Sequence, residues 1–420
     1  MYGTDNKTFP DADSTALLLL KENLQNFPNF DITGSNLYTR LGDLTMALNI
    51  FQHFYPYFEV TKTDWVSALK VAIKQAYTDQ NAQDFQRTFR QMTAKLKDGH
   101  ISVSSANDKA VYLPMLTWEW IENELVITYV GDSNTTLKRG DIVKEIDNVS
   151  AKDYFAVIYP NISAATKGWL ESRAQTESLL GEKGSLMKLR IVRNNETPVE
   201  VTLIRNTSQM KYYSSLPAKD SIKSLPNGIM YINMDAASIE AIDKALPQLQ
   251  KSRVIICDLR GYPNSNHKFI SYLLTIKDTS RQWMQIPQII YPDHERIAGW
   301  QNEGWGLQPN SIHLGAKIIF LIDGRAISYA ESFMSFIENY KLATIIGQPT
   351  ARTNGNINPF SLPGGYYISW TGMKVSKHDG STHYGVGILP NIYVQKTIKG
   401  VREGRDEFLE KAVEVGGSDC

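Results

Sequence analysis

The chain has 420 residues, which is too long for one ordinary hydrophobic core, so two or three domains are expected. Its content of 42% hydrophobic and 21% charged residues is that of a soluble globular protein. Lys and Arg number 44, as do Asp and Glu, so no net charge favours nucleic acid or an anionic membrane as a partner. No apolar stretch is long enough to span a bilayer, so an integral membrane protein is not expected. The apolar run at residues 16–20 lacks the basic flank and the cleavage site of a signal peptide, so we do not expect it to be one.

The first hundred residues have the pattern of helices that lead into a turn. Asp64 can cap a helix that begins at Trp65. A second helix has one apolar stripe and is expected to end near Gly99, because glycine readily forms a left-handed cap. His100 comes next, followed by the alternating pattern of a short strand. His100 therefore lies at a helix-to-strand junction that can present its side chain.

Residues 111–206 change to a pattern of short strands. These strands are expected at residues 124–130, 186–192 and 199–204, the last two forming a hairpin. Residues 137–148 are similar to the Gly-Asp signature of PDZ domains, which bind peptide C-termini by adding a strand to a sheet edge. The stretch 151–181 is longer than such a domain needs, so we expect it to hold an inserted helix.

The second half of the chain alternates strands with helices, after a polar stretch at residues 206–223 that we expect to be a linker. Such alternation predicts a largely parallel sheet covered by helices. The expected strands are residues 229–234, 254–259, 318–322, 344–346 and 366–370, and the expected helices are residues 267–276, 328–340 and 403–415.

Ser328 lies where an apolar strand and a short turn lead into a helix. Its hydroxyl would face the start of that helix, where backbone N–H groups favour negative charge. A serine and a histidine are the least that a base-activated nucleophile requires, and Ser328 and His100 are the candidates. Each also has a structural alternative, since serine often caps helices and a lone histidine at a junction is often a packed side chain.

The remaining histidines offer no stronger pair. His267 and His383 lie in the same half of the chain as Ser328 and are reserve candidates for the base. No two histidines share a helix face at metal-binding spacing, so no metal is expected. The turn after residues 254–259 is rich in Gly, Pro and Asn, and its N–H groups could stabilise an oxyanion; an ordinary strand-to-helix turn is the alternative.

Taken in chain order, these motifs resemble the serine peptidase family of the C-terminal processing (tail-specific) proteases, the tricorn core protease and the interphotoreceptor retinoid-binding protein. The matching segments are residues 97–100, 140–141, 256–261, 328–331, 345–350 and 385–390. The resemblance implies an α/β fold with a ClpP/crotonase-like ββα core. Its implied domains are an N-terminal helical domain at 1–110, an inserted PDZ-like domain at 111–206 and a catalytic core with a C-terminal helix at 207–420.

The resemblance also implies which residues carry the chemistry. The C-terminal processing branch takes its base, a lysine, from a turn after the serine, but Thr353 stands at that position here. The adjacent Arg352 cannot substitute, because a guanidinium does not become neutral at working pH. The Asp-Gly-His turn is similar to that of the tricorn-like branch, in which this histidine is the base. By this resemblance Ser328 is the nucleophile and His100 activates it.

The same resemblance supplies candidates for the rest of the site. The backbone N–H groups of Asn264 and Tyr329 are the implied oxyanion donors, although Asn264 and Ser265 stand where the family carries paired glycines. The tricorn-like branch orients its histidine with a glutamate, and Tyr384 occupies the comparable place. Tyr384, Glu331 or a backbone carbonyl is therefore expected to orient His100.

The sequence thus predicts a serine peptidase that hydrolyses peptides or unfolded protein tails without a metal or organic cofactor. The PDZ-like domain would hold the extended end of the substrate, and the sequence indicates no oligomeric state. The resemblance of its domain architecture to that of secreted bacterial proteases implies a periplasmic or extracellular location, although the chain shows no export signal. The alternative is a catalytically degenerate binding protein of the same fold for peptides or apolar ligands, which the altered oxyanion turn would suit.

Overall fold

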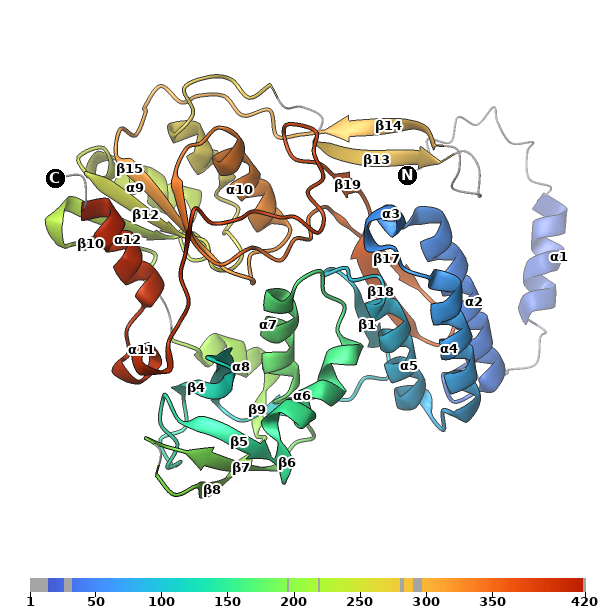
Figure 1. Cartoon of the computed structure of the whole chain (residues 1–420). Coiled ribbons are helices and arrows are strands. Elements are labelled where there is room, and N and C mark those ends of the chain that lie inside the picture. Colours follow the sequence, from blue (N-terminus) through green and yellow to red (C-terminus); the bar gives the residue numbers. More distant parts are fainter. Residues whose placement is uncertain are drawn as a thin grey trace.

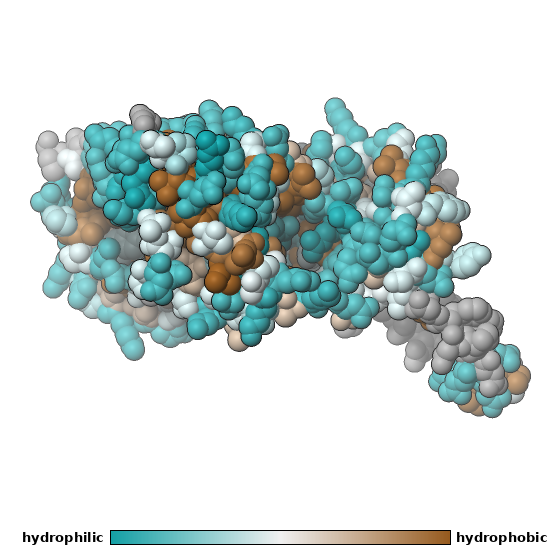
Figure 2. Space-filling view, turned by 90° about the horizontal axis from the view of Figure 1, so that it is seen from below, coloured by the Kyte–Doolittle hydropathy of each residue, from teal (hydrophilic) through white to brown (hydrophobic). Residues whose placement is uncertain are grey.

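The computed structural model describes residues 14–25, 32–194, 196–217, 220–279, 283–289 and 297–417. These residues form three lobes, which we call the helical lobe, the β lobe and the core lobe (Figure 1). Among the described helices, none is both long and apolar enough to cross a bilayer. Seen from below, the surface is mainly hydrophilic, with hydrophobic side chains in small patches between polar ones (Figure 2).

The helical lobe joins the N-terminal helices to a three-stranded sheet. Helix α1 (Ser14–Gln25) stands apart from this lobe (Figure 1), whose elements are α2 (Leu37–Phe54), α3 (Phe58–Thr61), α4 (Trp65–Thr78), α5 (Ala82–Ala94), β1 (Ser102–Ser105), β17 (Ile357–Ser361) and β18 (Tyr366–Thr371). Strand β18 lies between β1 and β17 and is antiparallel to both. The aromatic core of this lobe therefore contains side chains from both ends of the sequence, including Phe51, Phe89, Tyr366 and Trp370.

The cap predicted for the helix at Trp65 is confirmed, because Asp64 accepts the N–H of Ser67 at 2.9 Å. The expected cap at Gly99 is wrong. Helix α5 ends at Ala94, and the left-handed residue is Lys97, with φ 56°. A glycine is required at position 99 because the backbone there packs closely against Ile327: a Cβ atom on Gly99 would lie only 2.9 Å from Cδ1 of Ile327.

The β lobe contains the strands expected for residues 111–206. Its main sheet has the order β3-β4-β5-β7-β8, and β6 pairs with β5. The bounds are β2 (Tyr112–Leu113), β3 (Leu116–Ile121), β4 (Glu124–Val130), β5 (Ile142–Ile146), β6 (Val149–Ser150), β7 (Leu186–Val192), β8 (Val199–Ile204) and β9 (Thr207–Ser208). The expected hairpin is β7 and β8, and the identification of this lobe as PDZ-like stays a prediction.

Two expectations in this part of the chain need correction. The inserted segment holds two helices instead of one, α6 (Ala151–Ile158) and α7 (Lys167–Glu177), joined through the short helix η1 (Tyr159–Asn161). The expected linker is also partly folded, as β9 and α8 (Gln209–Ser215). It packs because the buried Tyr212 and the partly buried Leu216 join the apolar core of the β lobe.

The core lobe is built on a six-stranded sheet of order β10-β11-β12-β15-β16-β20. Strands β10 and β11 are antiparallel, and the other neighbours are parallel, as the alternating pattern predicts. The bounds are β10 (Ile222–Leu225), β11 (Ile229–Asn233), β12 (Val254–Asp258), β15 (Lys317–Ile322), β16 (Thr344–Gly347) and β20 (Ile392–Tyr393). A smaller sheet holds β13 (Met284–Ile289), β14 (Ile297–Glu303) and β19 (Lys374–Val375).

Helices cover both faces of the core sheet. Helices α9 (Ile239–Leu249) and α10 (Tyr329–Asn339) pack on one face and α12 (Glu407–Gly417) on the other. The helix expected at 267–276 is only a short 3-10 helix, η3 (His267–Tyr272), and another, η2 (Pro226–Gly228), precedes β11. The closing helix is split into α11 (Ile398–Glu403) and α12, because Gly404 adopts φ 76° between them. The predicted α/β class is confirmed.

Candidate active site

Ser328 has a strained backbone at the end of the turn between β15 and α10. Its φ is 59° and its ψ is −118°, a conformation that costs a non-glycine residue about 1–3 kcal/mol. A serine that merely caps a helix needs no such strain, and the Ser328 side chain accepts no capping hydrogen bond. Among the described residues, its Oγ atom has no hydrogen-bond partner. A sharp strand-to-helix turn that presents an unbonded hydroxyl is the geometry of a nucleophile.

Thr353 connects the turn of Ser328 with the turn of His100. Its carbonyl accepts the N–H of Ser328 at 2.9 Å, and its Oγ1 accepts the N–H of Gly99 at 3.2 Å. Gly99 also lies against Ile327, the residue before the serine. The structure therefore joins the two turns that carry Ser328 and His100, although they are far apart in the sequence. Thr353, expected only as the residue that replaces a lysine, holds the two turns together.

His100 is oriented by Thr371 and Asp98. Its Nδ1 lies 2.8 Å from Oγ1 of Thr371, and that hydroxyl donates to Oδ1 of Asp98 at 2.7 Å. Because the hydroxyl gives its only hydrogen to Asp98, it can only accept from Nδ1–H. The unprotonated nitrogen of the neutral ring is then Nε2. The fully buried Asp98 carboxylate also accepts the N–H groups of His100 and Thr371, at 2.9 and 2.8 Å.

The surroundings of His100 favour its neutral form. Burial lowers the pKa of the imidazole below its ordinary value of 6.5. The carboxylates of Asp98 and Glu331 oppose this effect and raise the pKa in part. The influence of Glu331, one helical turn after Ser328, also fits the proximity of α10 to His100. A ring that is neutral at physiological pH can accept a proton from a nucleophile.

Neither residue expected to orient His100 bonds to it. The Tyr384 hydroxyl bonds the carbonyl of Lys97 at 2.7 Å and lies 3.0 Å from the Tyr55 hydroxyl, so it supports the turn before Asp98. The Glu331 carboxylate is fully buried and accepts from the hydroxyl of Thr350 and from the N–H of Arg352, the latter at 2.8 Å. Both side chains stabilise segments that flank the site.

The two reserve bases are engaged elsewhere. His383 is fully buried, and its Nε2 lies 3.4 Å from Oε2 of Glu331. His267 contacts the side chain of the residue after Ser328: its Nδ1 lies 2.8 Å from the hydroxyl of Tyr329, which also accepts the His267 N–H at 2.9 Å. Its ring is tilted on Trp305, with centroids 4.4 Å apart. Burial lowers the pKa of His267, with a smaller contribution from Lys268.

The two expected oxyanion donors differ in their availability. The N–H of Tyr329 is at the first position of α10 and makes no hydrogen bond with a described residue. The N–H of Asn264 donates to the carbonyl of Met234 at 2.9 Å, so in this conformation it is not available to an oxyanion. The sequence could not reveal this, because the acceptor is the residue that follows β11, the strand next to β12. Tyr329 is thus the available donor of the two.

A buried ion-pair cluster fixes the start of the loop after β12. The Arg260 guanidinium, only 6% exposed, bonds both carboxylate oxygens of Asp258 and of Asp406 at 2.6 to 2.8 Å. The Tyr231 hydroxyl donates to Oδ2 of Asp258 at 2.8 Å. Within the described part of the chain, no three His, Cys, Asp or Glu side chains gather in a way that could hold a metal ion.

Sequence reasoning missed Thr371 and Asp98 as partners of His100. Asp98 was visible in the Asp-Gly-His turn, and its position two residues before His100 was the available signal. Thr371 is 271 residues away from His100 and reaches it only because β18 pairs with β1. A hydroxyl residue at the end of an ordinary strand carries no signal of such a role.

Comparisons with known proteins concern the family and the fold of the chain. Residues 228–394, which include Ser328 and Thr353, match the model of peptidase family S41. The fold is similar to mature CPAF, with a TM-score of 0.72 and 15% identity, covering 90% of this chain and 96% of that one. The photosystem II D1 C-terminal processing protease has a TM-score of 0.50 and 14% identity, covering 91% and 98%. The search of curated proteins found no match. The core of the chain, residues 228–394, therefore matches the model of peptidase family S41, and the fold of the chain is shared along most of its length with mature CPAF and with the D1 C-terminal processing protease.

Proposed function

We propose that the protein is a serine peptidase in which His100 activates Ser328. The observation that carries this proposal is the strained conformation of Ser328, because a structural serine would have no reason to keep it. The hydrogen-bonded chain from His100 through Thr371 to Asp98 supports it. Such a chain fixes both the orientation of the imidazole and the nitrogen that carries its proton.

The proposed reaction starts with Nε2 of His100 taking the hydroxyl proton of Ser328 while Oγ bonds the carbonyl carbon of the scissile peptide. The carbonyl oxygen becomes an oxyanion, to which the N–H of Tyr329 donates. When the tetrahedral intermediate breaks down, the imidazolium gives its proton to the leaving amine. A water molecule, deprotonated by the same nitrogen, then hydrolyses the acyl-enzyme and restores Ser328. The cation formed on His100 is stabilised through Thr371 by the carboxylate of Asp98.

The substrates we propose are peptides or unfolded protein tails, and the β lobe would hold the extended end of such a chain as a PDZ domain does. Support comes from its contact with the site, because α7 lies between this lobe and the others (Figure 1). A Cβ atom on Gly324, in the turn before Ser328, would lie 2.8 Å from the Cα of Gly168 in α7. A periplasmic or extracellular location is part of the proposal, from the architecture shared with secreted bacterial proteases.

The first test is cleavage of peptides. We expect the purified protein to cut members of a mixed peptide library, with new termini detected by mass spectrometry, and the Ser328→Ala protein to cut none. No cleavage by the unaltered protein, under conditions in which it is folded, would contradict the proposed activity. The degenerate binding protein of the same fold would then be the better description.

The second expectation concerns pH. The base must be neutral, and burial lowers the pKa of His100 below 6.5, so activity should be retained into mildly acidic solution. It should fall only as the pH drops through that lowered value and the ring is protonated. The measurement is kcat/KM between about pH 4 and 8. An acid limb clearly above pH 6.5 would contradict the assignment of His100 in this environment.

A further inference from the structure

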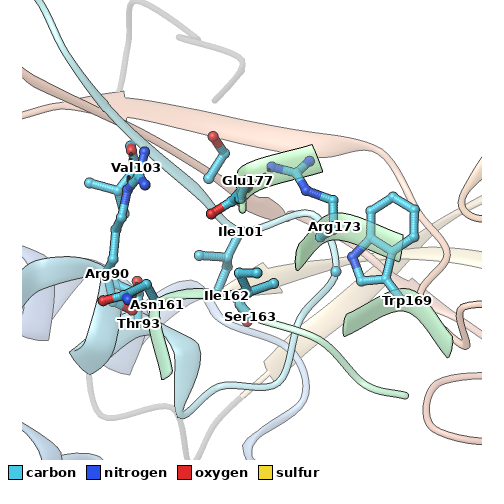
Figure 3. A pocket seen from close by; sticks show the side chains of 12 residues that line it. Arg90, Thr93, Ile101, Val103, Asn161, Ile162, Ser163, Trp169, Arg173 and Glu177 are labelled. Atoms are coloured by element: carbon cyan, nitrogen blue, oxygen red, sulfur yellow. Dashed lines mark hydrogen bonds and ion pairs between the residues drawn. The ribbon is translucent and has the colours of Figure 1, made fainter. Parts of the chain in front are cut away.

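A cavity lies beside the catalytic turn, between the helical lobe and the inserted helices of the β lobe (Figure 3). It is a small cavity that opens to solvent, and its lining comes from α5, β1, η1, α7 and the segments next to them. Figure 3 shows Arg90 on one side of it, Trp169 and Arg173 on the other, and Ser163 between them. None of these side chains takes part in the proposed reaction.

Polar groups that can donate hydrogen bonds dominate this cavity. The indole Nε1 of Trp169 is buried and has no partner among the described residues. Among the described residues, Arg90 donates one hydrogen bond, from its Nε–H to the carbonyl of Val103 at 3.1 Å. Its two terminal nitrogens therefore remain available to a ligand. The buried Ser163 hydroxyl accepts a backbone N–H, and its own hydrogen has no acceptor among the described residues.

The charge of the lining favours an anion. Arg90 and Arg173 are the two cations, and the one carboxylate, Glu177, lies 3.3 Å from Arg173 and already pairs with it. Among the described residues, Arg90 has no carboxylate partner. Ile101 and Ile162 supply apolar walls between the charged groups. Unsatisfied donors, one unpaired cation and apolar walls together fit a carboxylate attached to a short aliphatic stem.

The cavity is connected with the catalytic residues through two hydrogen bonds. The Ser163 hydroxyl accepts the N–H of Asp98 at 2.8 Å, so the floor of the cavity holds the carboxylate residue behind His100. Gly99, which lines the cavity, donates its N–H to Thr353, the residue that binds Ser328. A Cβ atom on Gly99 would lie 3.0 Å from Nε1 of Trp169. A group bound here would thus lie next to the scissile peptide.

We propose that this cavity is a substrate subsite that takes a carboxylate of the peptide, with Arg90 and Trp169 as its ligands. The inference rests on the proposed peptidase function and adds a specificity to it. The carboxylate comes either from an acidic side chain near the scissile bond or from the C-terminus of a short peptide. Both present the same two oxygens to the same donors, and experiment separates them.

The test compares peptides that differ only in charge. Each peptide that the enzyme cuts is prepared with every acidic side chain replaced by its amide and, separately, with its C-terminus amidated. We expect kcat/KM to fall about 10- to 100-fold in one of these arms, mainly through KM, because hydrogen bonds from a cation to a carboxylate are lost. Arg90→Gln should abolish most of that difference. Arg87→Gln, on the same helix but paired with Asp84 away from the cavity, should keep it.

Two further measurements keep the proposal open to refutation. Trp169→Phe retains the ring but loses the N–H, and it should weaken the preference if Arg90→Gln fails to fold. Binding of the same peptide pairs to Ser328→Ala protein, read by calorimetry, tests the subsite without catalysis. A binding preference for the charged peptides supports the subsite even if the unaltered protein cuts nothing. Equal affinity in both arms, or a preference that survives Arg90→Gln and Trp169→Phe, overturns it.

Discussion

Replacing Ser328 by alanine is expected to lower kcat about 10³-fold or more, and His100→Ala should have a similar effect. The kcat of the double variant should be little lower than that of either single variant, because the nucleophile and its base act as one unit and the loss of either removes the contribution of both. Ser328 is held in a strained conformation and its side chain makes no hydrogen bond with a described residue, so its replacement should leave the fold and the thermal unfolding unchanged. Steady-state kinetics on one cleaved peptide, with circular dichroism of each variant, provide the measurement.

The pattern of the single and double variants separates the proposed pair from other assignments. Losses that multiply in the double variant would mean that the two residues act independently. A folded His100→Ala protein with near-full activity would exclude His100 as the base. His267 would then be the side chain to test, because it lies beside Tyr329, whereas His383 is fully buried against Glu331.

The second large effect should come from the groups behind His100. Asp98→Asn removes the carboxylate that accepts the Thr371 hydroxyl, and we expect kcat to fall about 10²- to 10³-fold. It also removes a negative charge that raises the pKa of His100, so the acid limb of the pH profile should move to lower pH. A residue with only a structural role would lower activity without moving that limb. Asp108→Asn is the matched control, since Asp108 caps the turn after β1 and does not bond to His100.

Thr371 allows the same idea to be tested without changing charge. Thr371→Val keeps the shape of the side chain but removes the hydroxyl between Nδ1 and Asp98, and should lower kcat about 10²-fold. Thr371→Ser restores the hydroxyl and should recover most of the activity. If Val and Ser variants were equally active, the hydrogen-bonded chain would have no part in catalysis.

The sequence predicted the elements of the core well because their signals are local. Apolar runs such as Ile229–Asn233 and Val254–Asp258 form parallel strands, and the strand-turn-helix pattern around Ser328 gives the expected junction. The linker was misjudged because one buried tyrosine, Tyr212, on the short helix α8 is enough to anchor a polar segment to a lobe. A count of polar residues does not reveal such an anchor.

The site was predicted less completely because its remaining parts depend on pairing across the chain. Nothing near Gly99 indicated that it meets Ile327 and Trp169 at close range, so a left-handed cap was the reasonable expectation. Likewise, the acceptor that occupies the Asn264 N–H and the hydroxyl that orients His100 both come from other strands. The order of the motifs along the chain identified Ser328 and His100 as candidates. The hydrogen-bond partners that surround them become visible only in the tertiary structure.

The pairing of β18 with β1 also bears on how the protein matures during synthesis. The aromatic interior of the helical lobe includes Leu362, Tyr366, Ile368, Trp370 and Tyr384, which leave the ribosome more than two hundred residues after the helices they complete. Domains made first usually fold first. Here the N-terminal segment must wait with part of its apolar surface uncovered, and His100 gains Thr371 only at the same late stage. A nascent chain would therefore acquire the hydrogen bonds that orient His100 only once it is nearly finished.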